Sequence, residues 1–211
     1  MTEPASKVPR RERERLRHRQ EILHAARHLV GARGIEGLTV EQVAREAEFA
    51  VGSIYRHFSS KEELIVAVVG DFADDIIEEM SEIVAEPSPY LDRLERFVRL
   101  SLQHQAECQP LFEALLTLPG QFPVPGTTTG DQMMEMHRRY LTVLEAIIAA
   151  GEAEGVLRPG ARLSHAVALA ALLQGYAKVC WMGGVALATD PASEVLASFL
   201  DGSRARTGGA T

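Results

Sequence analysis

The chain has 211 residues, 46% of them hydrophobic and 24% charged, a composition that is typical of a folded globular protein and excludes disorder throughout. Its formal net charge is -7, but residues 1–61 hold 12 Lys and Arg against 8 Asp and Glu, so this end carries +4 and the remainder -11. A basic end on an acidic chain favours contact with phosphate at that end alone.

The N-terminal residues, the longest apolar stretch and the cysteines indicate where the protein acts and which chemistry it lacks. The first twenty residues are polar and rich in arginine, without the apolar block of a secretory signal, so we expect a cytoplasmic protein. The apolar stretch 166–188 has Gln174 and Lys178 near its middle, which favours a buried helix over a membrane span. Cys108 and Cys180 are far apart and predict reduced thiols. No catalytic signature is visible, so we expect neither an enzyme nor a cofactor.

Apolar spacing predicts an all-α chain of nine helices. Residues 1–9 are interrupted by Pro4 and Pro9 and are expected to be a disordered arm, after which the pattern turns helical at Arg10. Seven further helices are expected at 40–47, 51–58, 60–86, 90–107, 110–116, 131–154 and 163–182. A final, ninth helix contains Val195 and Phe199. The pairs Thr39 with Gln42 and Ser60 with Glu63 have the spacing of capping boxes, which mark where two of these helices start.

The most specific pattern lies in residues 19–64. The sequence GLTVEQVA at 37–44 leads through a short turn into VGSIYRHF at 51–58, and Ser60, Lys61 and Glu62 follow. Two short helices joined by a three-residue turn form a helix-turn-helix, whose second helix enters the major groove of DNA. This segment closely resembles the DNA-binding region of the Tet repressor family.

The resemblance implies roles for individual residues. Thr39, Tyr55 and Lys61 match family positions that touch phosphate, and the groove-facing positions are matched by Val51, Gly52, Ser53, Arg56 and His57. The chemistry of three of these residues supports the assignment. Gly52 and Ser53 are small and allow the helix to approach the groove closely, and Lys61 lies in the first turn of a helix, where an anion is favoured. Arg56 is either a bidentate guanine reader or a phosphate contact.

Three positions depart from the family pattern. Glu48 stands where the turn usually has glycine, and must take a conformation that glycine reaches at lower cost. Ala50 replaces a hydroxyl cap, and Glu41 is negative where the family is often basic. The arginine-rich run at residues 10–19 is either a contact to flanking DNA or a solvated charged face.

The resemblance also implies a nine-helix Tet repressor-like fold, with an N-terminal helix-turn-helix head and a C-terminal ligand-binding and dimerisation body. We expect the head at 10–61, the body at 62–202 and a disordered tail at 203–211. The helix at 163–182 is apolar on two faces, for example Val167 and Ala171 against Leu169 and Leu173, so one face is left for a twin subunit. We therefore expect a homodimer on a palindromic double-stranded operator.

The resemblance further implies a small-molecule pocket between the middle helices. The candidates to line it are bulky apolar side chains and side chains with a polar end. They are His104, Phe112, Met133, Met136, His137, Tyr140, Gln174 and Trp181. No paired ligand spacing is present, so no metal site is expected. The sequence thus predicts a repressor released by an apolar or aromatic effector. The alternative is an adaptor of the same fold that takes no small molecule and acts through a protein partner.

Overall fold

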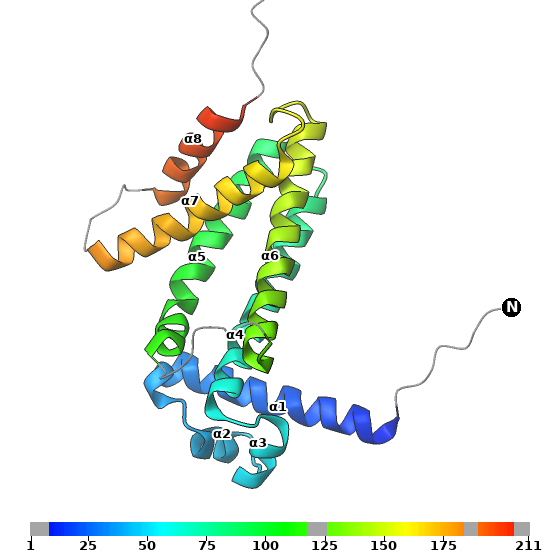
Figure 1. The fold of residues 1–211 in the computed structure, drawn as a ribbon, viewed down its shortest axis with the longest axis vertical. Helices are drawn as coiled ribbons and strands as arrows, with labels where there is room; N and C mark the ends of the chain where they lie inside the picture. Colours follow the sequence, from blue (N-terminus) through cyan, green and yellow to red (C-terminus); the bar gives the residue numbers. More distant parts are fainter. Residues whose placement is uncertain (1–8, 118–125, 184–189, 205–211) are drawn as a thin grey trace, which may run out of the picture. The chain divides into compact units, whose positions relative to one another are not determined.

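The computed structural model describes residues 9–117, 126–183 and 190–204. Within these ranges the chain is all-α, as predicted, and holds no strand beyond an isolated bridge between Leu157 and Arg204 (Figure 1). The elements are α1 (Arg10–Arg33), the 3-10 turn η1 (Ile35–Gly37), α2 (Val40–Glu46), α3 (Val51–His57), α4 (Lys61–Ala85), α5 (Tyr90–Thr117), α6 (Thr128–Ala153), α7 (Arg162–Gly183) and α8 (Pro191–Ser203).

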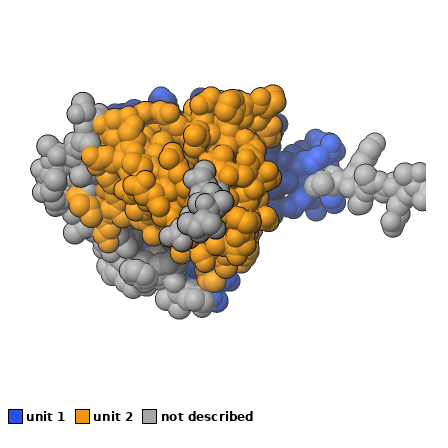
Figure 2. All heavy atoms as spheres, turned by 90° about the horizontal axis from the view of Figure 1, so that it is seen from above, with its two compact units in different colours: residues 1–71, 110–132 blue, residues 72–109, 133–211 orange. Residues whose placement is uncertain are grey.

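Two compact units make up the chain, coloured separately in Figure 2. Unit 1 comprises residues 1–71 and 110–132, and unit 2 comprises residues 72–109 and 133–211. The helices α4, α5 and α6 each contribute residues to both units. Most of the expected tail, residues 205–211, and most of the expected arm, residues 1–8, lie outside the described residues, but α8 reaches Ser203 and the Arg158 N–H donates to the Ser203 carbonyl at 2.9 Å.

Unit 1 forms its core from one stripe on each of its first four helices. The stripes bury Ile22, Ala26 and Leu29 of α1, Val40 and Val43 of α2, Ile54 of α3, Phe58 and the start of α4 at Leu64 and Ile65. Their spacing of three or four residues places them on one face of each helix. Because the helices α2 and α3 have only seven residues each, this shared core is what holds them in place.

Both predicted capping pairs form. The Thr39 Oγ1 accepts a hydrogen bond from the Gln42 backbone N–H at 3.2 Å, at the start of α2. The Ser60 Oγ accepts from the Glu63 N–H at 3.1 Å, while the Glu63 carboxylate reaches back to the Ser59 N–H at 2.7 Å. These bonds satisfy backbone donors that the first helical turn leaves free, and so fix where α2 and α4 begin.

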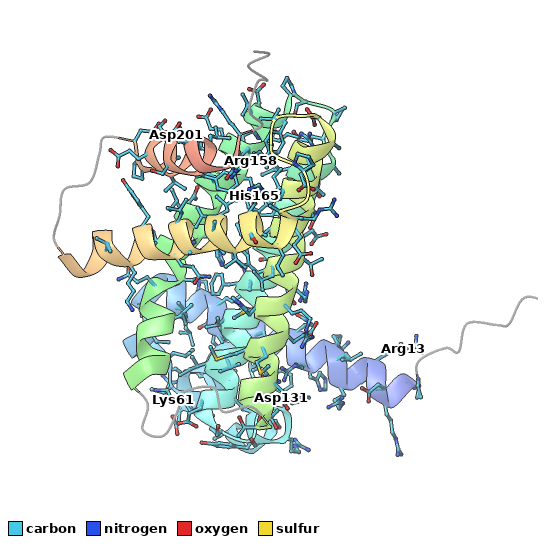
Figure 3. The ribbon with its side chains drawn as sticks, turned by 45° about the horizontal axis from the view of Figure 1, so that its top comes forward. Arg13, Lys61, Asp131, Arg158, His165 and Asp201 are labelled. Atoms are coloured by element: carbon cyan, nitrogen blue, oxygen red, sulfur yellow. The ribbon has the colours of Figure 1, made fainter. Side chains whose placement is uncertain are left out.

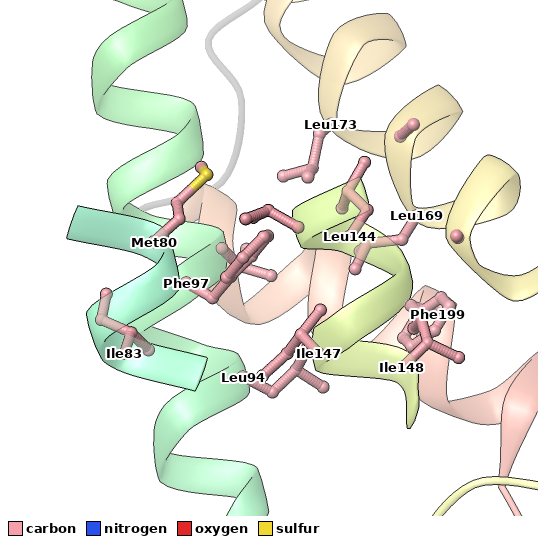
Figure 4. Packing of buried hydrophobic residues seen from close by; sticks show 14 of the residues in the cluster. Met80, Ile83, Leu94, Phe97, Leu144, Ile147, Ile148, Leu169, Leu173 and Phe199 are labelled. Carbon is pink, nitrogen blue, oxygen red and sulfur yellow. The ribbon is translucent and has the colours of Figure 1, made fainter. Parts of the chain in front are cut away.

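Unit 2 is built around a core of large apolar side chains (Figure 4). The core joins Met80 and Ile83 of α4, Leu94 and Phe97 of α5, Leu144, Ile147 and Ile148 of α6, Leu169 and Leu173 of α7, and Phe199 of α8. Gly151 permits one close approach, since a Cβ there would lie 2.4 Å from the Tyr90 ring. This contact sets how near the beginning of α5 comes to the end of α6.

One predicted boundary is wrong. The sequence places a helix end near Glu107 and a restart at Pro110, whereas α5 runs unbroken from Tyr90 to Thr117. The apolar period continues through the proline, because Cys108 and Leu111 on either side of it are both buried. Burial of this continuous stripe outweighs the one backbone hydrogen bond that proline removes from a helix interior.

Candidate DNA interface

The short helix α3 has one buried and one exposed face. Ile54 is 1% exposed and packs into the unit 1 core, as does Phe58 directly after the helix. Tyr55, on the opposite face, is 49% exposed. The other exposed residues of α3 are Val51, Gly52 and Arg56. A rigid core therefore holds a row of solvent-facing side chains on a helix short enough to lie in a major groove.

Ser53 and Arg56 share this outer side of α3. The Arg56 Nη2 donates to the Ser53 Oγ at 2.6 Å, so the guanidinium is held along the helix and is not extended into solvent. A guanidinium has five N–H donors, and this bond uses one of them. The rest stay free for a base edge or a phosphate, so both interpretations of Arg56 remain open.

The turn between α2 and α3 is a Schellman motif. The Phe49 N–H donates to the Ala44 carbonyl at 2.8 Å, and the Glu48 N–H donates to the Arg45 carbonyl at 3.3 Å. This bonding requires a left-handed residue just after the helix, and Glu48 has φ 58°. Among the described residues it is the one non-glycine with a positive φ. The prediction that Glu48 takes a conformation suited to glycine is confirmed.

Ala50 gives α3 no side-chain cap, as its lack of a hydroxyl predicts. At the start of α4, Lys61 is partly buried and lies in the first turn with Glu62 and Glu63 (Figure 3). A hydrogen bond from Ser60 lowers the pKa of Glu62, and Glu63 is held by Ser59. Both carboxylates of this turn therefore have hydrogen-bond partners in the neighbouring serines, and Lys61 is the cation of the same turn.

His57, at the C-terminal end of α3, lies in a cluster of cationic groups. Its ring centroid is 6.2 Å from that of His18 on α1, and the Arg19 Nη1 donates to its carbonyl oxygen at 3.3 Å. Burial lowers the pKa of His57, and His18, Arg15, Arg19 and Arg56 lower it further by charge repulsion. All of these causes favour the neutral form of His57 in the free protein, whereas a nearby phosphate would favour the charged form.

Two residues of α1 support the site: His18, which sequence analysis did not assign to it, and Arg19, the last arginine of the arginine-rich run. Arg19 lies 4.3 Å over the Phe58 ring, so it packs unit 1 and is not a free cation of the arginine-rich run. His18 stacks edge-on against Phe49 at 5.1 Å as well as against His57. Their spacing in the sequence could have indicated this role, because His18 and Arg19 precede Ile22 by four and three residues and so lie on the face of α1 that becomes buried.

The pocket candidates lie in different environments. The Tyr140 hydroxyl and the Ser101 Oγ are 3.1 Å apart and hydrogen-bonded, and Gln105 donates to the same Ser101 Oγ at 3.3 Å. Sequence analysis missed Ser101 and Gln105, which are small or polar residues on an otherwise apolar stripe. The His104 Nε2 lies 3.5 Å from the Cys108 Sγ, and burial lowers the pKa of His104.

The remaining candidates differ in their exposure. Met133 and Met136 are partly buried, whereas His137 and Gln174 are exposed. The side chains of Phe112 and Trp181 lie outside the described part of the structure. In that part, no group of three or more His, Cys, Asp or Glu side chains is placed to hold a metal ion, and no helix is long and apolar enough to cross a membrane.

Comparison with known proteins identifies the segment that carries the interface. Residues 22–68 match the family model of bacterial regulatory proteins, tetR family. Residues 22–68 are therefore a TetR-family segment. All eight predicted DNA contacts, from Thr39 to Lys61, lie inside the matched range, and residues 10–21 of α1 lie outside it.

Two curated relatives that match this chain in part are named as repressors. The HTH-type transcriptional repressor KstR2 of Rhodococcus jostii is 35% identical over 85 residues, which cover 40% of this chain and 42% of that protein. The HTH-type transcriptional repressor AcnR of Corynebacterium glutamicum is 34% identical over 102 residues, 46% of this chain and 54% of its own. The matches span about half the length of these relatives.

The fold of two solved structures matches nearly the whole chain. A putative TetR-family transcriptional regulator from Mesorhizobium loti has a TM-score of 0.71 at 19% identity, over 90% of this chain and 98% of that one. A putative transcriptional regulator from Saccharomonospora viridis, solved in complex with choline, has a TM-score of 0.70 at 18% identity, over 90% and 100%. At these identities the likeness concerns the fold alone.

Proposed function

We propose that this chain is a TetR-family transcriptional repressor that binds a double-stranded DNA operator through α3. The observation that carries the proposal is the outer face of α3, where Tyr55, Arg56 and Gly52 are exposed on a helix fixed by Ile54 and Phe58. The net charge of residues 1–61 supports it, as do the names of the relatives that match this segment. A regulator of this kind acts in the cytoplasm, where the chromosome is, and needs no catalytic group.

Within this interface the proposed contacts differ in kind. Thr39, Tyr55 and Lys61 bind phosphate and set the register, while Val51, Gly52, Ser53 and Arg56 face the groove floor. His57 also lies on the groove-facing side, where its cationic neighbours favour a phosphate contact. Gly52 leaves open space, because a Cβ there would meet nothing within 4 Å, so the backbone can approach a base edge closely. Phosphate contacts act on all sequences alike, whereas a base contact acts on the operator alone.

The test uses duplexes that the wild-type chain selects from a random-sequence library. Lys61→Ala should weaken binding to selected and random duplexes alike and lower the slope of log affinity against log salt by about one contact. Arg56→Ala should cost about 1 to 3 kcal/mol on the selected duplex only, if Arg56 reads a base. Arg138→Ala, an exposed arginine of α6 in unit 2, is the control and should bind like wild type. Unchanged affinity in both Lys61→Ala and Arg56→Ala would refute the proposed interface.

We further propose that α7 and α8 join two chains into a homodimer. One face of α7 buries Leu169 and Leu173 within the chain, while Leu163, Val167 and Val179 are 60%, 51% and 58% exposed. An apolar helix face of this size normally has a partner, and a second copy gives two-fold related α3 helices on a palindromic site. Val167→Glu should dissociate the dimer in sedimentation measurements. A wild-type monomer at micromolar concentration would refute it.

We also propose that unit 2 takes an uncharged apolar effector. Burial lowers the pKa of the partly buried His104, Lys178 and His137 are exposed, and the buried Arg93 already has Glu154 as its ion-pair partner, so none of these groups favours an acidic ligand. The helix α4 runs unbroken from Lys61 to the core residues Met80 and Ile83, so its movement would alter the DNA contacts. Emission of Trp181, the single tryptophan, should change with an effector in parallel with release of DNA. A change in emission without release, or no retained ligand in native mass spectrometry, would favour the adaptor without ligand.

A further inference from the structure

The N-terminal half of α1 is a helix without a core. No residue from Arg10 to Glu21 is buried, and the first buried side chain is Ile22. Leu16, the one aliphatic side chain of this part, is 47% exposed. At 1.5 Å per residue these 12 residues extend about 18 Å along the helix axis. In Figure 1 they run past α2 and α3 of the same unit, and Arg13 lies near the projecting end in Figure 3.

Residues 10–17 of α1 are strongly basic, and they are called the arm from here on, as distinct from the expected disordered segment at residues 1–9. The arm holds five arginines against two glutamates. Exposed pairs one turn apart support the helix: Arg10 with Glu14, Arg15 with Glu12, and Arg17 with Glu21 of the next turn. Arg11 and Arg13 have no ion pair among the described residues. Such pairs explain how the arm stays helical, but they leave an excess of positive charge that unit 1 does not use.

One face of the arm continues the candidate DNA interface. Arg11, Arg15 and His18 are spaced by four and three residues, so they form a single stripe along α1. The stripe begins at α3, because the His18 ring contacts the His57 ring at 6.2 Å and Arg15 is near enough to lower the pKa of His57. Arg15 and Arg11 then lie about 4.5 and 10 Å further along the axis. Arg13 and Arg17 lie on the opposite side of the helix.

We propose that this stripe is a second DNA-binding element, which contacts the phosphate backbone beside the segment that α3 occupies. The proposal rests on the proposed DNA-binding function and extends it outside the family-matched residues 22–68. Phosphate is the partner that fits, because the stripe is cationic, has no apolar residue between its arginines, and is continuous with α3. The contact is electrostatic, so it adds affinity at any flanking sequence and releases counterions.

The test compares two charge-matched double variants on two duplexes. Arg11→Gln with Arg15→Gln removes the stripe, and Arg13→Gln with Arg17→Gln removes the same charge from the other face of the same helix. One duplex is trimmed to the site that the wild-type chain selects, and the other is extended by about one helical turn, roughly 10 base pairs, at each end. Far-ultraviolet circular dichroism checks that both variants keep α1 helical.

The wild-type chain should bind the extended duplex more tightly than the trimmed one, and the stripe variant should lose that difference. Its slope of log affinity against log salt on the extended duplex should fall by about 1.8 per chain, for two lost phosphate contacts. The control variant should keep most of the length dependence. Equal losses in both variants, or an unchanged slope in the stripe variant, would overturn the proposal. If the wild-type chain selects no DNA, the proposed function itself has failed.

Discussion

Replacing Glu48 by glycine should make the protein more stable. At φ 58°, Glu48 keeps a Cβ in the left-handed region, which costs a non-glycine residue about 1 to 2 kcal/mol. Glycine removes that cost but loses about 0.5 to 1 kcal/mol more chain entropy on folding. The net expected gain is about 0.5 to 1 kcal/mol, or about 1 to 4 °C in the unfolding midpoint for a chain of this size.

In this experiment the effect of the Glu48 charge must be distinguished from the effect of its left-handed backbone conformation. Glu48→Ala removes the charge and keeps the Cβ, so its stability should stay near that of wild type. Both variants remove one negative charge from the turn before α3, and should bind DNA about twofold more tightly at low salt, from about 0.4 kcal/mol across roughly 10 Å of water. The gain in affinity should be the same in both variants, while the gain in stability should appear only with glycine.

Urea unfolding followed by circular dichroism measures the stability difference, and a salt titration of DNA binding measures the charge effect. Equal unfolding midpoints for Glu48→Gly and Glu48→Ala would refute the reasoning, because the left-handed conformation would then carry no cost. A loss of the turn would show instead as weaker DNA binding in the glycine variant than in the alanine variant.

Three further predictions follow from local contacts. Ala50→Ser supplies the missing cap of α3 and should stabilise the chain by about 0.5 to 1 kcal/mol in urea unfolding, and no change would show that the cap geometry is not reached. Gly151→Ala should destabilise the chain by more than about 2 kcal/mol because its Cβ would meet the Tyr90 ring at 2.4 Å, whereas Gly31→Ala, with nothing within 4 Å, should be neutral or stabilising. The pKa of His57 is lowered in the free folded protein, so the unfolded chain binds a proton more readily and the free energy of unfolding should fall as the pH drops below about 6.5. Binding to DNA should be coupled to proton uptake by His57, and should therefore tighten as the pH falls. His57→Gln should remove that part of the pH dependence of binding, and an unchanged pH profile would contradict the assignment.

The helix-turn-helix could be predicted from the sequence because its signals are local. The Thr39 and Ser60 caps act within four residues, and the burial of Ile54 and Phe58 follows from helical spacing. The left-handed turn at Glu48 could be predicted for the same reason, since three residues between two helices leave few conformations. Such features depend on neighbours along the chain, and they are readable without the rest of the fold.

Other features depended on residues far apart in the sequence. Only the tertiary structure showed that Arg19 packs on Phe58, that His18 meets His57, and that the free side of α7 is the one with Val167. It also decided that α5 continues through Pro110, where local propensity predicts a break. In each case a contact across the fold supplied the free energy, because burial against a partner helix exceeds the modest preferences that a short stretch of sequence expresses by itself.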